Sequence, residues 1–149
     1  MALSIRNAEA ITACDEFVDA CDTGSTQPNP VLVIYDGTPP TLVEDALSGN
    51  NILAELAMSN PAFGAAADDN PGGKATANAI SDDTSANNTG TATFFRIFDR
   101  QATALARIQG AIRATGDPDN GEELVLNSTA IQSGALVEIT SLTATMPEG

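Results

Sequence analysis

The stretch Val31-Leu32-Val33-Ile34-Tyr35 gives the clearest strand signal in the sequence, with five apolar residues in a row, three of them β-branched. Apolar side chains at successive positions are typical of a strand that is covered on both faces. Asp36-Gly37 ends this strand. A second stretch, Thr93-Phe94-Phe95-Arg96-Ile97-Phe98, combines aromatic and β-branched residues and also favours a strand. The two stretches predict a chain built on a β-sheet.

Weaker alternating patterns surround these two stretches and are separated by clusters of Gly, Pro and Asn. They predict about seven or eight short antiparallel strands, arranged as a β-sandwich or barrel. The additional strands are expected at 52–58, 74–80, 104–112, 123–127 and 135–146.

The N-terminal part carries the helical signal. Ile11, Cys14, Val18 and Cys21 recur at helical spacing and form one narrow apolar stripe. Ser4 is a candidate N-cap, and Thr23-Gly24 and the Pro-containing loop after it end a helix of about 18 residues. We expect this helix to lie against a sheet or a neighbouring subunit. The 149 residues then form a single domain, with a helical arm at 1–24 and the β-sandwich or barrel at 30–149. The loop at 36–50 is expected to bulge out as a surface arm.

The chain is strongly acidic, with twenty Asp plus Glu against six Lys plus Arg and a net charge of −14. A surface of this charge repels phosphate backbones and anionic membranes, so we expect neither a nucleic-acid nor a membrane partner. No apolar run approaches the roughly 18 residues that a membrane span requires, and no signal peptide is visible. We expect a soluble protein that is made in the cytoplasm.

Residues that could support catalysis are scarce. The sequence contains no His, which excludes a Ser-His-Asp arrangement and leaves a zinc site without support. On an intact helix, Cys14 and Cys21 are about 10 Å apart, beyond the roughly 7 Å that a disulfide tolerates. They are read as two buried hydrophobes, with an intermolecular bridge or a reactive thiol as the alternatives. We expect no enzyme activity and no cofactor.

Two other clusters admit more than one interpretation. Arg96, Arg100, Arg107 and Arg113 fall within 18 residues; they either pair with nearby carboxylates or form a stripe that meets a neighbour's carboxylates. The segment 117–123 (DPDNGEE) either forms a tight hairpin turn or supplies oxygen ligands to Ca²⁺. Phe94, Phe95 and Phe98 are read as core residues, with a ligand platform as the alternative.

Several stretches together resemble a widespread family of small structural proteins of tailed bacteriophages. The resemblance rests on the order and spacing of 31–37, 53–64, 75–80, 90–96 and 123–127, followed by the Thr/Ser-rich strand at 139–145. The acidic segment at Asp68-Asp69 and the long turn at 117–121 depart from the family pattern.

The resemblance implies a virion protein, expected to be a head decoration (cement) protein on the capsid exterior. Its partner would be the major capsid protein, and symmetry favours a homo-oligomer, a cyclic trimer. The interface residues expected from the sequence are Ile11, Cys14 and Val18 on the helix and the four arginines. The helix and the loop at 36–50 would reach across a capsid junction. The alternatives are a neck, tail or fibre-attachment component, or a carbohydrate-binding module on the virion surface.

Overall fold

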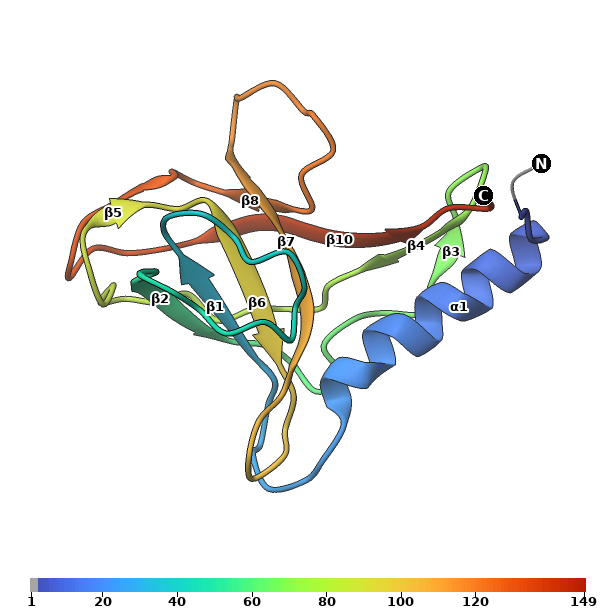
Figure 1. Cartoon of the computed structure of the whole chain (residues 1–149), viewed down its shortest axis with the longest axis horizontal. Helices are drawn as coiled ribbons and strands as arrows, with labels where there is room; N and C mark the ends of the chain where they lie inside the picture. The colour runs from blue at the N-terminus through green and yellow to red at the C-terminus, as the bar shows by residue number, and fades with distance from the viewer. Residues whose placement is uncertain (1–2) are drawn as a thin grey trace.

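The computed structural model describes residues 3–149, which form a mainly β fold with one N-terminal helix (Figure 1). This confirms the fold class that the sequence predicts. The helix α1 covers Asn7–Asp19 and continues as a short 3₁₀ turn, η1, at Ala20–Asp22. The strands are β1 Val31–Tyr35, β2 Ile52–Ala57, β3 Ala67–Asp68, β4 Gly73–Thr76, β5 Gly90–Thr91, β6 Phe94–Phe98, β7 Ala106–Ala114, β8 Leu124–Leu126, β9 Ala130–Ile131 and β10 Ile139–Met146.

Eight of these strands form one sheet in the order β2-β1-β6-β7-β8-β10-β4-β3, while β5 and β9 pair separately. The sheet changes direction along this order, so that β1 and β6 run at a steep angle to β10 (Figure 1). One hydrophobic cluster collects residues from both parts of the sheet and from α1, which makes the fold sandwich-like.

The sheet is mixed, whereas the sequence predicted antiparallel strands throughout. β7 and β8 pair in parallel, with Ile112 opposite Leu124 and Ala114 opposite Leu126. A tight hairpin, one of the two interpretations of segment 117–123, is therefore wrong. Its turn residues bond to one another instead, as in the Gly121 N–H to Asp119 carboxylate bond of 3.0 Å, and they close a wider loop. This loop returns the chain to the edge of β7 in the same direction.

The two stretches that decide the fold lie side by side in the sheet. β1 pairs with β2 on one edge and with β6 on the other. Its alternate residues Leu32 and Ile34 join the main core, while Val33 and Tyr35 join a smaller cluster on the opposite face. The apolar character of β1 on both faces thus reflects two separate hydrophobic clusters.

The helix is shorter than expected and begins later. Arg6 occupies the N-cap position without a side-chain cap, so Ser4 is not the N-cap. The reason is that the preceding residues run extended beside the C-terminal end, where the Ile5 N–H donates to the Glu148 carbonyl at 2.8 Å. A helical turn at Ser4 would remove this bond.

The apolar stripe of α1 packs against β4 and β10. Ala10, Cys14, Val18 and Cys21 are buried, and all but Ala10 belong to the main core cluster. The contact is close because β4 begins with Gly73, where an added Cβ would lie 2.7 Å from the Ala10 carbonyl oxygen. The helix is therefore an integral layer of the domain rather than a separate arm.

The loop at 36–50 lies back over the sheet instead of projecting as an arm (Figure 1). Its base is closed by Asp36, whose carboxylate accepts the Asn51 backbone N–H at 2.6 Å and the Asn51 side-chain amide at 2.9 Å. These bonds, the side-chain bond first, lower the pKa of Asp36. Leu47 anchors the loop's far side by packing on the cluster of Val33, Tyr35 and Phe94. Within residues 3–149, no helix has the length and apolar character needed to cross a membrane.

Candidate functional site

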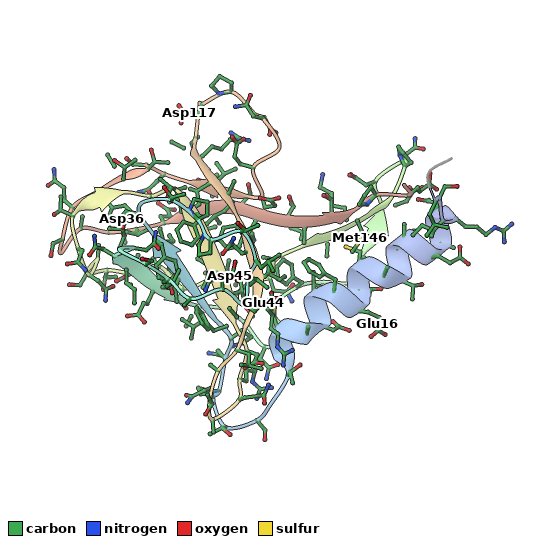
Figure 2. All side chains as sticks on the ribbon, in the orientation of Figure 1. Glu16, Asp36, Glu44, Asp45, Asp117 and Met146 are labelled. Atoms are coloured by element: carbon green, nitrogen blue, oxygen red, sulfur yellow. The ribbon has the colours of Figure 1, made fainter. Side chains whose placement is uncertain are left out.

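The helix residues proposed for an interface are used inside the chain. Cys14 and Val18 are 0% and 1% exposed, and Ile11 is half-buried. Cys14 and Val18 cannot reach a neighbouring subunit while the domain is folded, so their assignment to an interface is wrong: both are core residues. The exposed face of α1 instead carries Glu9, Glu16 and Asp19, with Glu16 directed away from the sheet (Figure 2).

Both cysteines are free and buried, as expected for small core residues. The thiol of Cys14 contacts the Ala144 carbonyl of β10 at 3.5 Å. Burial raises the pKa of Cys21 to about 12 and also raises the pKa of Cys14. Neither group is poised as a thiolate nucleophile near neutral pH.

Arg96 lies inside the molecule and not on a surface stripe. It is 5% exposed, and its Nε donates to Gln109 Oε1 at 2.9 Å. Its Nη2 donates to the carbonyls of Leu42 and Asp45 at 3.3 and 3.0 Å. Arg96 therefore ties the loop at 36–50 to the sheet, and it makes no ion pair with a carboxylate of the described residues.

The other three arginines also have partners within the chain. Arg107 pairs with the buried carboxylate of Asp99 at 2.7 Å. Arg113 lies 3.6 Å from the Asp119 carboxylate. Arg100 donates to the carbonyl of Gln27 at 3.0 Å and to that of Asp22 at 3.4 Å. Intramolecular pairing thus accounts for Arg107 and Arg113, whereas Arg96 and Arg100 bond to neutral oxygens, an arrangement that the sequence did not suggest.

The remaining surface is dominated by carboxylates. Lys74 pairs with Asp69 at 3.3 Å, so five of the six cations are engaged within the chain. Arg6 is the exception, because no hydrogen bond or ion pair joins its side chain to another residue of the range 3–149. All acidic residues except the buried Asp99 are at least partly exposed, and they have little compensating charge.

The segment 117–123 projects from the molecule with Asp117 on the projecting loop (Figure 2). Its acidic side chains bond to the loop's own backbone, as Glu122 does with the Asn120 N–H at 2.8 Å. Within the described part of the chain, no three acidic, His or Cys side chains converge as metal ligands. Turn formation therefore accounts for the composition of this segment.

The aromatic residues are largely withdrawn from solvent. Phe94 and Phe95 are buried, and Tyr35 stacks on Phe94 with ring centroids 5.1 Å apart. Phe98 is half-buried at the edge of an open depression of about 340 Å³ whose floor includes Val31 and Ile52. Sugar-binding modules present exposed aromatic faces, so this burial weighs against a carbohydrate platform on β6.

A feature that sequence reasoning missed lies between β7 and β10. Only three residues of β8 separate these two long strands, and beyond Glu123 the strands diverge (Figure 1). We call the opening between Ile108-Gln109 and Thr143–Thr145 the fork. It encloses about 120 Å³. Its other lining residues are Phe17, Phe63, Phe95, Glu123 and Leu142. The unequal lengths of the predicted strands were the only sequence signal for it.

Glu123 holds the apex of the fork. Its carbonyl accepts the Thr143 N–H of β10 at 3.1 Å, and its carboxylate accepts the Ala111 N–H of β7 at 2.9 Å. Gly110 is required beside it, because an added Cβ would lie 2.8 Å from the Glu123 carboxylate and 2.7 Å from the Phe95 ring. One residue thus joins two strands at the point where they separate.

Comparison with known proteins gives no assignment: no protein-family model, no curated protein and no solved structure matches the chain.

Proposed function

We propose that this chain is a structural protein of a bacteriophage virion, a capsid decoration (cement) protein. In this proposal it binds the outer capsid surface and stabilises the head by bridging neighbouring subunits of the major capsid protein. The choice of a virion follows from the sequence resemblance. The choice of a binding role follows from the surface of the molecule.

The observation that carries the proposal is the distribution of charge. Five of the six cations are bound within the chain, and a net charge of −14 remains on a domain of 149 residues. Such a surface favours association with a basic patch and keeps a protein soluble when many copies are present. Both properties suit a protein that coats a lattice in many copies.

The exposed face of α1 is the contact surface that we propose for the capsid. It carries the exposed carboxylates of Glu9, Glu16 and Asp19. Several carboxylates on one face favour association with a basic patch on a partner. Because the opposite face of α1 forms core, deleting the helix would unfold the domain, and the contact must be tested by substitution at the surface.

Copy number in the purified virion tests the proposal. Quantitative mass spectrometry against the major capsid protein should give on the order of hundreds of copies if the chain decorates the whole lattice. About a dozen copies or fewer would contradict the decoration role and support a neck, tail or fibre-attachment component.

A charge-reversal experiment tests the contact surface. Glu9→Lys, Glu16→Lys and Asp19→Lys combined should weaken binding to undecorated capsids at least about tenfold. The matched control reverses three exposed acids elsewhere, Glu44, Asp82 and Glu138, and changes net charge equally. Equal losses in both variants would show that overall charge matters and that α1 is not the contact.

A further inference from the structure

We infer that the fork accepts an extended segment of a second copy of this chain, namely residues Leu3–Arg6, and that copies join head to tail in this way. The inference concerns self-assembly and does not depend on binding to a capsid.

The fork is a row of the sheet that the chain fills only in part. β7 has nine residues and β10 has eight, but β8 between them has three. Neighbouring strands are about 4.8 Å apart. Because β7 and β10 both pair with β8 at the apex, the row between them is one strand wide there, and the ribbons of β7 and β10 diverge away from β8 (Figure 1).

The backbone groups that face this space lack partners. The Thr115 N–H donates to the Leu126 carbonyl of β8 at 2.8 Å. Since main-chain groups alternate along a strand, the N–H and C=O of Gln109 point to the same side. On β10, the Thr143 N–H donates to Glu123 across the same row, so Thr145 also points into it. Among residues 3–149, no loop backbone and no side chain bonds to the main chain of Gln109 or Thr145. By the same alternation, the ladder bonds of β7 with β6 and of β10 with β4 use the main-chain groups of the neighbouring residues.

Unpaired strand edges of this kind are templates for an added strand. The outer edges of the sheet are less available. β2 is covered by 79–88, as in the Asn87 N–H to Leu53 carbonyl bond of 2.8 Å, and β3 has two residues. The fork is thus an edge that lies within the sheet and has apolar side chains beneath it.

The segment Leu3-Ser4-Ile5-Arg6 has the composition that the fork requires. Leu3 is the most exposed large apolar residue of residues 3–149, at 88%, and Ile5 is 38% exposed. Their spacing places both on one side of an extended strand, where they can cover Phe17 at the fork. The Arg6 side chain has no hydrogen-bond or ion-pair partner among residues 3–149, and it would bring a cation toward Glu123.

The donor comes from another copy because of its position in the fold. Residues 3–6 precede the first turn of α1, whereas Phe17 lies in its last turn. Ten residues of helix, about 15 Å, separate Asn7 from Phe17. A backbone hydrogen bond from Ile5 to Glu148 holds residues 3–6 beside the C-terminal end. Since donor and acceptor are different surfaces, the contact is heterologous, and copies close into a ring where the rotation between them allows it.

A complementation experiment tests strand donation on the full-length chain. Leu3→Asp with Ile5→Asp removes the donor, and Phe17→Asp blocks the acceptor. In sedimentation equilibrium, the unaltered chain should form a discrete oligomer whose mass is a multiple of the 15.2 kDa of one chain. The dissociation constant of each variant alone should be at least about 100-fold higher. A mixture of the two variants has one intact donor and one intact acceptor, and it should stop at the dimer.

The control variant combines Leu105→Asp with Leu136→Asp. These two leucines are 50% and 51% exposed, and they lie outside the donor segment 3–6 and outside the fork. This variant should assemble as the unaltered chain does. The inference is overturned if the unaltered chain remains monomeric at about 1 mM, if the donor variant assembles normally, or if the mixture stays monomeric. Circular dichroism confirms that each variant is folded.

Discussion

Two parts of the sheet differ in how completely their strands are paired. At β2-β1-β6-β7, consecutive strands pair over most of their lengths, and apolar side chains cover both faces of β1. At β7-β8-β10, the pairing stops after three residues and the strands separate around Glu123. We refer to these as the closed half and the open half.

The difference shows where the stability of this fold resides. In the closed half, hydrogen bonds and packing support each other, so the strands specify their own arrangement. In the open half, α1 packs on β4 and β10 and covers their apolar side chains. A helix packed on the face of a sheet adds no hydrogen bonds to the strand edges. The open half therefore retains unpaired backbone that is available for binding, while the closed half does not.

The largest expected effect comes from truncating the core beneath the closed half. Leu32 is completely buried on β1, so Leu32→Ala should reduce the free energy of unfolding by about 2–5 kcal/mol. Phe17→Ala, at the exposed rim of the fork, should cost less than about 1 kcal/mol. Urea denaturation measures the free energy of unfolding of both variants. Equal losses would show that the fork contributes as much to stability as the core of the closed half.

Arg96 provides the next test, because it fastens the loop at 36–50 to the closed half. Arg96→Met removes three hydrogen bonds of a charged donor and should cost about 2–3 kcal/mol. Hydrogen exchange should accelerate at 40–46 and remain unchanged at 143–146. An equal acceleration at 40–46 and at 143–146 would contradict an anchoring role limited to the loop.

The buried thiol of Cys21, in the 3₁₀ turn that follows α1, should make the fold sensitive to alkali. Burial raises the pKa of Cys21 from 9.0 to about 12, so above pH 9 the thiol ionises in the unfolded chain before it does so in the folded one. The stability that this group contributes is complete below pH 9 and is lost as pH rises toward 12. The loss should be about 1.4 kcal/mol at pH 10.

Thermal or urea unfolding across pH 8–10.5 checks this effect. Cys21→Ala should flatten the decline, and Cys14→Ala, whose pKa is also raised by burial, serves as the companion variant. A decline that is identical in the unaltered chain and in both variants would assign it to other groups.

The smallest effect is expected at the apex of the fork. Glu123→Ala leaves the Ala111 N–H without its carboxylate acceptor and should cost about 1 kcal/mol. Glu123→Gln keeps an amide oxygen in place and should lose less than half of that. If both variants matched the unaltered chain in urea denaturation, Glu123 would not hold the two strands together.

The sequence predicted the closed half well, because Val31–Tyr35 and Phe94–Phe98 have strong local propensity that long-range packing reinforces. It also predicted the helix and its apolar stripe. The parallel pairing of β7 with β8 could not be predicted, because loop composition indicates a turn without fixing the direction in which the chain returns.

The candidate sites were harder to foresee for a related reason. Arginines near acidic residues suggest ion pairs, but Arg96 is satisfied by carbonyls of a loop distant in sequence. The stripe of Cys14 and Val18 identifies an apolar face without saying whether it is covered by the same chain or by another. The fork depends on unequal strand lengths and on the alternation of backbone groups, which only the folded structure displays.

Residue-resolved hydrogen exchange on the dilute chain tests the contrast between the halves most directly. Gln109 and Gly110 are neighbours on β7, but the Gly110 N–H faces β6, where Gly110 pairs with Phe95, while that of Gln109 faces the fork. We expect strong protection of the Gly110 amide proton, and exchange at least about 100-fold faster at the amides of Gln109 and Thr145. Equal protection at Gln109 and Gly110 in the monomer would contradict the account and show that the fork is closed.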